Sequence, residues 1–449
     1  MGLQGQIRQQ LAAAALKRQL ERVSKQAGEG ARQPGRTSGA TCASSDGSEW
    51  NARAGFEAMP LYQQVDLMRR MGDELQLRSP FFRVHEGMAG ATTTIEGREY
   101  INYANYNYLG MASDPVVAAH AKAAIDRYGT SASASRMVAG ERPIQRELER
   151  ALASLYGTDD CVAFVSGHAT NVTTIGALFS QGDLILHDAL AHNSIVQGAQ
   201  LSGAKRLSFP HNDWAALDEI LARTRHEYRN VLVAIEGLYS MDGDVPDLAR
   251  FVELRRRHRF FLMVDEAHSL GVLGARGAGI REHAGVNHDD VDIWMGTMSK
   301  TLAGCGGYIA GSQPLVDILR HLAPGFLYSV GLAPALAAGS LAALQQMLAA
   351  PERVATLRAR GQQFLNAARE AGFDTGTSAG YAVVPIITGS SLKAAQWANG
   401  LFEGGINVQP IFYPAVEERA ARLRFFICST HQPEQISCTI DALKRVARR

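Results

Sequence analysis

Apolar residues gather in short, continuous runs through the middle of the chain, and amphipathic stretches separate these runs. The stretches at 213–228 and 247–258 repeat apolar residues at helical spacing, whereas the runs are almost entirely apolar. Strands that are apolar throughout are covered on both faces, and their alternation with helices predicts a mainly parallel sheet in an α/β protein. The expected strands are CVAFVSG (161–167), DLILHD (183–188), VLVAIEG (231–237), FFLMVDE (260–266), DIWMGT (292–297) and GYIAGS (307–312).

The last third of the chain has a different order of elements. Two long helices are expected at about 333–348 and 351–370. The expected strands YAVVPIIT (381–388), INVQPIFYP (406–414) and RLRFFICS (422–429) follow them. This order predicts a second, smaller α/β domain at the C-terminal end.

These patterns divide the chain into four parts. We expect an N-terminal helix and a flexible linker in 1–57, and a segment packing on the small domain in 58–112. The large domain is expected in 113–335 and the small domain in 336–449. The linker prediction rests on residues 26–50, which lack large aliphatic side chains and cannot bury enough apolar surface to order themselves.

The N-terminal helix is expected over residues 1–25, where basic residues outnumber acidic ones. Three interpretations of this helix stay open, namely a linker, a docking element and a transit peptide. The folded protein is expected to begin near Met59. No apolar run reaches the roughly 18 residues of a membrane-spanning helix, so none is predicted.

Charge and cysteine content exclude several classes of partner. The chain has 45 Lys plus Arg against 44 Asp plus Glu, which argues against nucleic acid or an anionic membrane as its main partner. Its five cysteines are scattered, with no CxxC pair and no Cys/His ligand spacing, so we predict neither a disulfide framework nor a metal site. Cysteines of this kind fit a reducing compartment, and we expect a cytoplasmic protein.

Residues that carry chemistry follow several of the expected strands. Asp265 ends one of them and is either a solvated strand terminus or a carboxylate that pairs with a cationic ring nitrogen. His192 opens a helix, where it either caps that helix or stacks on a flat ring. Gly167 lies in a strand–helix turn, which is either an ordinary connection or a phosphate site.

Lys300 stands just past another strand end, in the sequence MGTMSKTLAGCGGYIAGS. Taken alone it is a surface lysine, but a desolvated lysine has a lowered pKa and becomes a nucleophilic amine. Thr297 and Ser299 supply hydroxyls suited to a phosphate. Because a glycine turn, a histidine, DEAH and SK occur in this order on successive strand ends, the sequence predicts a pocket for pyridoxal 5'-phosphate (PLP).

Several sequence blocks extend this pattern over most of the chain, from about residue 80 to 447. With these blocks the chain resembles the α-oxoamine synthases, a branch of the fold-type I PLP-dependent transferases that includes 8-amino-7-oxononanoate synthase, glycine C-acetyltransferase and serine palmitoyltransferase. The resemblance implies a large domain with a mainly parallel seven-stranded sheet, a smaller C-terminal α/β domain and a homodimer. The blocks are NYNYLG (105–110), ASRMVAGE (134–141), SGHATN (166–171), HNSI (192–195), YSMDGD (239–244), VDEAHSLGVLG (264–274), GTMSKTLAGCGGYIAG (296–311) and RLRF (422–425).

The resemblance also implies a role for each group around the cofactor ring. Lys300 would carry PLP as an imine and then act as acid and base at the substrate Cα. Asp265 would pair with the pyridine nitrogen, and His192 would stack on the ring. His268 would hydrogen-bond the ring hydroxyl or the incoming acyl carbonyl, and Ser240 would lie beside the ring hydroxyl.

Other residues would hold the phosphate and the substrate. Gly167 and His168 would offer backbone amides to the phosphate, and Thr297 would add a hydroxyl. Arg424 would clamp the carboxylate of the amino acid, because its planar fork suits a two-oxygen anion. Asn107 would be its neighbour on that carboxylate.

The chain departs from the usual family pattern at several positions. His168 replaces a residue that is usually aromatic, and Gln145 stands where a histidine is often found. Ser329 would reach the phosphate across the dimer interface, but Val330 beside it cannot donate a hydrogen bond. The sequences SGHATNVTTIG and TLAGCGGYIAG most resemble those of synthase domains in polyketide or prodiginine assembly lines. This resemblance implies an acyl carrier protein as a possible partner.

The function expected from this resemblance is a PLP-dependent, decarboxylative condensation of a small amino acid with an acyl thioester. The amino acid is glycine, alanine or serine, and the acyl donor is acyl-coenzyme A or an acyl carrier protein. Two alternatives stay open: an aminotransferase or lyase on the same fold, and a non-catalytic partner subunit. The presence of Lys300, Asp265 and His192 favours an active enzyme.

Overall fold

The computed structural model describes residues 55–413 and 415–448. The predicted helix over 1–25 and the predicted linker over 26–50 lie outside the described residues. The first regular elements are a 3-10 turn at Phe56–Ala58 and helix α2 at Pro60–Glu74. They start close to the position at which the folded protein was expected to begin.

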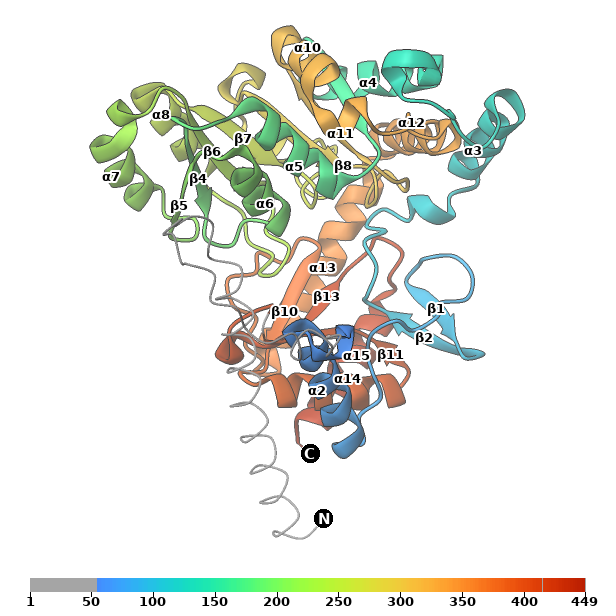
Figure 1. The fold of residues 1–449 in the computed structure, drawn as a ribbon. Coiled ribbons are helices and arrows are strands. Elements are labelled where there is room, and N and C mark those ends of the chain that lie inside the picture. Colours follow the sequence, from blue (N-terminus) through green and yellow to red (C-terminus); the bar gives the residue numbers. More distant parts are fainter. Residues whose placement is uncertain (1–54, 414, 449) are drawn as a thin grey trace, which may run out of the picture.

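A seven-stranded sheet forms the centre of the upper lobe in Figure 1. Strand β9 runs antiparallel to both of its neighbours, and every other pairing in the sheet is parallel. This confirms the predicted α/β fold of the fold-type I transferases with a mainly parallel sheet. In spatial order the strands are β3 (Asp160–Phe164), β9 (Gly307–Gly311), β8 (Ile293–Thr297), β7 (Phe261–Asp265), β6 (Val231–Glu236), β4 (Leu184–Asp188) and β5 (Lys205–Phe209).

Six of these seven strands coincide with apolar runs that predicted them, and β5 does not. Strand β5 lies at the edge of the sheet and pairs with β4 alone. Its sequence KRLSF is exposed at three of five positions. An edge strand with one solvated side lacks the continuous apolar pattern of a central strand, so the sequence signal was weak.

Each central strand is buried on both faces because its alternate residues enter two separate hydrophobic cores. In β6, Leu232 and Ala234 pack with residues of α5 and α6 on one face. Val233 and Ile235 pack in the other core, which includes residues of α7 and α8. These helices are α5 (Gly167–Leu178), α6 (Asn193–Ser202), α7 (Trp214–Thr224) and α8 (Leu248–His258).

The helix α13 (Glu352–Glu370) runs from the upper lobe into the lower lobe (Figure 1). Helix α12 (Pro334–Ala349), which precedes it, packs against α3 and α4. The remaining helices of the upper lobe are α3 (Pro115–Tyr128), α4 (Pro143–Tyr156), α9 (Ile280–Ala284), α10 (Gln313–Leu322) and α11 (Pro324–Leu327).

The lower lobe contains helix α2, two small sheets and two further helices (Figure 1). One sheet is antiparallel, in the order β10-β13-β12, and the other has the order β1-β2-β11. Their strands are β10 (Val383–Ile387), β13 (Arg422–Phe426), β12 (Gln409–Ile411), β1 (Thr92–Ile95), β2 (Arg98–Asn102) and β11 (Ile406–Asn407), and the helices are α14 (Ser391–Glu403) and α15 (Pro433–Ala447).

The single strand expected at 406–414 is wrong, because the structure divides it between both small sheets. Strand β11 pairs in parallel with β2, whereas β12 pairs antiparallel with β13. Pro410 is tolerated in β12 because this strand lies at a sheet edge, where one side needs no hydrogen-bond donors. The pairing of β2 with β11 supports the proposal that 58–112 packs on the small domain.

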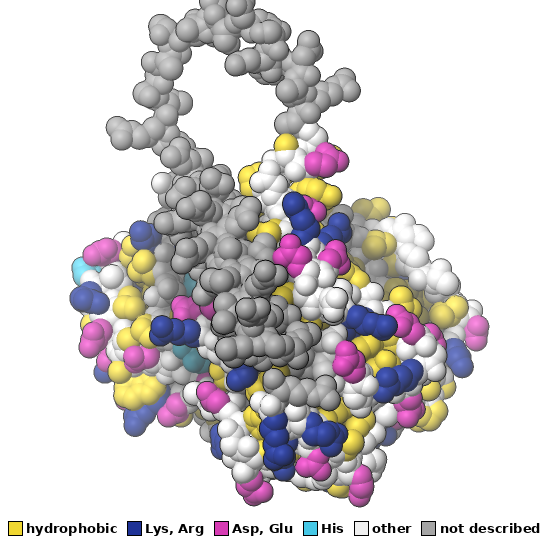
Figure 2. Space-filling view, turned by 90° about the horizontal axis from the view of Figure 1, so that it is seen from below, with side chains coloured by type: hydrophobic (Ala, Val, Ile, Leu, Met, Phe, Trp, Pro, Cys, Tyr) yellow, Lys and Arg dark blue, Asp and Glu magenta, His cyan; other side chains and the backbone are white. Residues whose placement is uncertain are grey.

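The described surface carries both signs of charge. Figure 2 shows Lys and Arg side chains interspersed with Asp and Glu over the described part of one face. Among helices in the described residues, none combines the length and the apolar character needed to span a membrane.

Candidate active site

The carboxyl ends of the parallel strands bring chemical groups together along one edge of the large sheet. Glu236, Asp265 and Thr297 are the last residues of β6, β7 and β8, and Glu236 lies opposite Asp265 in the strand register. Lys300 lies in the turn that follows Thr297. Ligands of α/β proteins bind outside this edge of the sheet, so these groups define the candidate active site.

A second hollow lies at the opposite edge of the sheet and has a volume of about 500 Å³. Phe261 and Ile293, the first residues of β7 and β8, line it together with Asp159 and His288. None of the residues predicted to carry chemistry lines this hollow, so we do not assign the active site to it.

Lys300 is a half-buried amine in a tightly folded loop. The backbone N–H of Met298 donates to the Gly306 carbonyl at 2.9 Å, and that of Ala303 donates to the Lys300 carbonyl at 3.0 Å. Burial lowers the pKa of Lys300 from 10.5 to about 8, although the carboxylates of Asp265 and Glu236 act in the opposite direction. A larger share of this lysine is therefore a neutral nucleophile near neutral pH than of an ordinary surface lysine.

Asp265 is a buried carboxylate that two donors hold in place. Its Oδ1 accepts from the backbone N–H of Ala267 at 2.9 Å, and its Oδ2 accepts from Nδ2 of Asn171 at 2.8 Å. The carboxylate ends a strand whose first residue, Phe261, is exposed and whose other residues are buried. Its pairing with the ring nitrogen of PLP stays a prediction.

His192 caps helix α6 and is only partly exposed. Its backbone N–H donates to Oε1 of Glu236 at 2.6 Å, which fixes the start of the helix. The buried part of the side chain lowers the pKa of His192, and Asp265 opposes this shift. The ring of His168 stands edge-on to it at a centroid distance of 6.1 Å, so the two predicted histidines lie beside each other.

His268 is buried and makes its contact through one ring nitrogen. Its Nδ1 lies 2.7 Å from the Tyr108 hydroxyl, and its ring stacks on Phe426 with an interplanar angle of 14°. Burial lowers the pKa of His268 well below 6.5, and the positive charges of Lys300 and Arg424 add to this effect. The imidazole is therefore neutral, with Nε2 as the nitrogen not engaged by Tyr108.

The turn after β3 packs directly against the end of β8. Gly167 is the first residue of α5, and a Cβ added to it would lie 2.6 Å from Oγ1 of Thr297. Only glycine permits this close approach, which places the unpaired N–H groups of the α5 N-terminus beside the lysine loop. The Thr297 hydroxyl donates to the Gly306 carbonyl at 2.9 Å and lies 2.8 Å from the exposed Ser299 hydroxyl.

Arg424 is a guanidinium with no carboxylate partner among the described residues. Its Nη1 contacts the Ser240 carbonyl at 3.3 Å and the Met241 sulfur at 3.2 Å. Its Nε is buried without a hydrogen-bond partner in the described chain. Burial lowers the pKa of this guanidinium. An unpaired donor on a buried cation is suited to an anionic ligand such as an α-carboxylate.

Three other predicted residues lie near the site in different settings. Nδ2 of Asn107 donates to the Ala89 carbonyl at 2.8 Å, and its Oδ1 accepts from the Ala112 N–H at 3.1 Å, so this amide ties two backbone segments together. Ser240 is half-buried in the loop after β6. Ser329 is half-buried in a loop beyond α11, and its role in phosphate binding stays a prediction.

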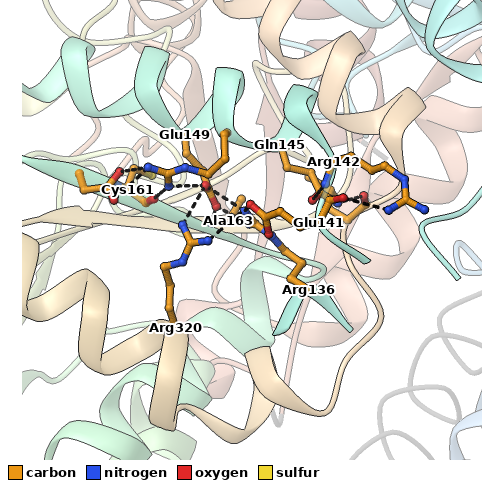
Figure 3. A network of polar contacts seen from close by, with 11 residues as sticks. Arg136, Glu141, Arg142, Gln145, Glu149, Cys161, Ala163 and Arg320 are labelled. Carbon is orange, nitrogen blue, oxygen red and sulfur yellow. Dashed lines mark hydrogen bonds and ion pairs between the residues drawn. The ribbon is translucent and has the colours of Figure 1, made fainter. Parts of the chain in front are cut away.

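An ion-pair network joins the segment that contains Arg136 and Glu141 to helix α4 and strand β3, close to the loop that contains Ser329 (Figure 3). Arg136 pairs with Glu141 at 2.6 Å and also with the fully buried Glu149. Glu149 accepts from the backbone N–H of Ala163 in β3 at 2.8 Å. Gln145, in the same view, donates to the Leu332 carbonyl at 2.7 Å. Within the block ASRMVAGE, Arg136 reaches the sheet through Glu149, and the Ala134 carbonyl accepts from the Gly331 N–H of the loop at 2.9 Å.

A second network fixes the YSMDGD loop that carries Ser240. The ring of His211 bridges Asp188 at the end of β4 and Asp244 in the loop, each at 2.8 Å. These two carboxylates raise the pKa of His211 to about 10, although burial opposes the shift. Its ring also packs edge-on against Tyr239 at 4.5 Å. The loop is thus held to the sheet by a charged histidine.

Three buried polar residues in this region were not among the predicted site residues. Glu236 touches His192, Asn171 touches Asp265, and Ser194 lies between Asn171 and His192. Glu236 had a usable signal, because it ends an apolar strand as Asp265 does. Asn171 and Ser194 had none, because each sits inside a helix and gains its role only through contacts distant in sequence.

The residues present fit PLP by three observations. The low pKa of Lys300 suits an amine that joins an aldehyde. The contact of Gly167 with Thr297 leaves helix N–H groups open to a phosphate. The unpaired Nε of Arg424 awaits an anionic group of the substrate. We therefore consider PLP compatible with the donor set of this site.

Comparisons with known proteins agree with this geometry. The model of the family "Aminotransferase class I and II" matches residues 98–443. The 8-amino-7-oxononanoate synthase of Pelobacter propionicus is 40% identical over 370 residues, covering 82% of this chain and 94% of that protein.

Two solved structures are similar over most of the chain. Serine palmitoyltransferase of Sphingomonas wittichii has a TM-score of 0.84 and 30% identity, covering 88% of this chain and 98% of that one. Serine palmitoyltransferase of S. paucimobilis, with bound PLP, has a TM-score of 0.83 and 28% identity, covering 86% of this chain and 98% of that one.

Proposed function

Because the chain belongs to the aminotransferase class I and II family and to its α-oxoamine synthase branch, we propose that it condenses a small amino acid with an acyl thioester. The reaction uses PLP, releases carbon dioxide and yields an α-amino ketone. The observation that carries this proposal is the presence in one site of a low-pKa amine, Lys300, and of a guanidinium, Arg424, whose buried Nε has no hydrogen-bond partner among the described residues.

The residues of the chain divide the work between binding and proton transfer. Bound PLP supplies an aldehyde that joins amines and a ring that takes up electrons from the substrate Cα. Asp265 holds the ring nitrogen charged, and His192 covers one face of the ring. Lys300 anchors the cofactor through Nζ, then removes the proton from Cα and later returns one. Arg424 binds the carboxylate and so orients the amino acid.

We propose that His268 assists the second substrate. Tyr108 engages its Nδ1, which leaves Nε2 available to an acyl carbonyl. When the carbonyl oxygen gains negative charge, an N–H at Nε2 stabilises it. Because the buried imidazole is neutral, it donates a hydrogen bond without carrying a positive charge that would attract any anion.

We also propose a homodimer with the site at the subunit boundary. Large apolar side chains on the segments around the predicted Ser329 contact are exposed, which supports this. Val138 is 83% exposed, Tyr328 86% and Val330 49%. Burying such a patch against a second copy would remove it from water.

The cysteines of the described chain are free, which supports the proposed cytoplasmic location.

The acyl donor is either acyl-coenzyme A or an acyl carrier protein, and the amino acid is glycine, alanine or serine. A one-carbon difference between amino acids changes affinity only modestly, so the substrate has to be measured. We propose to add each amino acid to the PLP-loaded protein and to follow the absorption of the cofactor. Each acyl donor is then added at equal concentration, and products are identified by mass spectrometry.

The expected product is an α-amino ketone formed with stoichiometric release of carbon dioxide and free thiol. A keto acid formed without consumption of thioester would instead show an aminotransferase. The Lys300→Ala variant is the control, and we expect it to hold no cofactor that borohydride can link covalently to the chain. Turnover by that variant would contradict the assignment of Lys300.

A further inference from the structure

Two buried residues with no assigned role connect Asp265 to His192. Asn171 in α5 and Ser194 in α6 are 1% and 0% exposed. Nδ2 of Asn171 lies 2.8 Å from Oδ2 of Asp265 and 2.9 Å from Oγ of Ser194. The same Oγ lies 2.6 Å from Nδ1 of His192. The four side chains form one continuous line of hydrogen bonds.

The direction of every bond in this line follows from its first member. A carboxylate can only accept, so Asn171 must turn its NH₂ group toward Asp265. The second N–H of that group then donates to Ser194, which leaves the hydroxyl proton of Ser194 for His192. The backbone N–H of Ser194 also points at Nδ1 of His192, at 3.3 Å. Two donors meet at Nδ1, so this nitrogen carries no proton.

We propose that Asn171 and Ser194 are positioning residues that hold His192 as a neutral imidazole with its proton on Nε2. The relevance of this state to catalysis rests on the proposed function, since His192 would cover the cofactor ring. Asn171 and Ser194 change the hydrogen-bond partner of His192 from an acceptor to a donor. Asp265 accepts at one end, and Ser194 donates at the other.

This reversal matters because a carboxylate in direct contact with an imidazole favours the imidazolium. A cationic His192 would oppose the positive charge that Asp265 maintains on the cofactor ring. The other charged groups that act on His192 are Lys300, His168 and Arg424, and all three disfavour its protonation. Glu236, also nearby, accepts from its backbone N–H and not from its ring. Ser194 thus supplies the specific contact that selects the protonated nitrogen.

The test measures the protonation of His192 directly, in cofactor-free protein labelled with ¹⁵N-histidine. Solid-state or solution ¹⁵N spectra distinguish the two neutral tautomers and the cation, and a His192→Asn variant identifies the signal. In the wild type we expect Nε2–H and a hydrogen-bonded Nδ1. An Nδ1–H tautomer, or a cation at neutral pH, would overturn the proposal without any variant having to fold.

A matched pair of variants isolates the hydroxyl. Ser194→Ala removes it, and we expect the pKa of His192 to rise by roughly 0.7 unit, because a hydrogen bond of typical strength to the neutral form is lost. Ser202→Ala removes a hydroxyl at the other end of α6, where Oγ donates to the Ala199 carbonyl at 2.8 Å, and should leave the titration unchanged. Equal titrations in Ser194→Ala and wild type would contradict the proposal.

The loaded enzyme supplies a second readout. In Ser194→Ala we expect the acid limb of the pH–rate profile to move to higher pH, and Ser194→Thr to restore it. If no condensation activity is found but the spectra show the expected tautomer and shift, the proposed function fails and the hydrogen-bond line stands. If activity is found and the tautomer is Nδ1–H, the proposed function stands and the proposal about Asn171 and Ser194 fails.

Discussion

The pKa of Lys300 provides a quantitative test of the site. Burial lowers this pKa from 10.5 to about 8, a shift of about 2.5 units. That shift corresponds to about 3 kcal/mol against the charged form. At pH 7 the neutral fraction is then about 300-fold larger than for an unperturbed lysine, since the ratio of neutral to charged amine changes tenfold per unit.

Pulse acetylation of cofactor-free protein measures this fraction without any turnover. The rate at which acetic anhydride labels an amine rises with pH and levels off above the pKa of that amine. We expect the Lys300 peptide to level off at about pH 8, well below the plateau of an unperturbed lysine amine. Mass spectrometry of the digested protein measures the labelling of this peptide at each pH.

Two charge variants give shifts of opposite sign. Asp265 raises the pKa of Lys300, so Asp265→Asn should move the plateau to lower pH. Arg424 lowers it, so Arg424→Gln should move the plateau to higher pH. A wild-type plateau near 10.5, or shifts of the same sign in both variants, would refute the electrostatic description of the site.

Three further predictions address binding and stability. Arg424→Gln should weaken amino-acid binding by about 10- to 100-fold, because a charge-assisted hydrogen bond is lost; a spectral titration measures this, and unchanged affinity would reject the clamp. Gly167→Ala places a Cβ 2.6 Å from Oγ1 of Thr297 and should lower PLP affinity by roughly tenfold, whereas Gly176→Ala meets only the Leu201 side chain and serves as control in equilibrium dialysis. His211 has a pKa raised to about 10, so its stabilisation is complete below about pH 6.5 and is lost as pH rises through 10. The melting temperature should thus fall more steeply with alkaline pH in the wild type than in His211→Gln, and parallel curves would reject this.

Much of the large domain was predictable because a central strand that is buried on both faces has a continuous apolar sequence. Asp265 and Lys300 were predicted for a related reason, since a charged residue at or just after the end of such a run lies near the carboxyl ends of the parallel strands. Strand β5 was not predicted, because one side of it is exposed to water and its sequence lacks a continuous apolar run. The apolar pattern of 406–414 predicts one strand, because local pattern does not record that its two halves pair with different partners.

The polar residues behind the site show the limit of such reasoning. Asn171 and Ser194 are neutral, lie within helices and have no pattern of their own. Asn171 acts on a carboxylate 94 positions further along the chain. Only the packing of α5 against α6 and the sheet brings these groups together. The roles of all the predicted site residues, Lys300 and Asp265 included, stay predictions.

Strand β2 pairs with β11, and the side chain of Asn407 donates to that of Asn102 across 305 positions at 3.0 Å. During synthesis the ribosome releases β1 and β2 together but β11 much later, so the upper lobe can form while the side of Ile101 and Asn102 that pairs with β11 still lacks its partner. Premature termination anywhere before residue 406 would therefore leave an unpaired β-edge available to other chains. A circular permutant that joins β11 directly ahead of β1 would shorten this wait, and its refolding yield would show how much the delay costs.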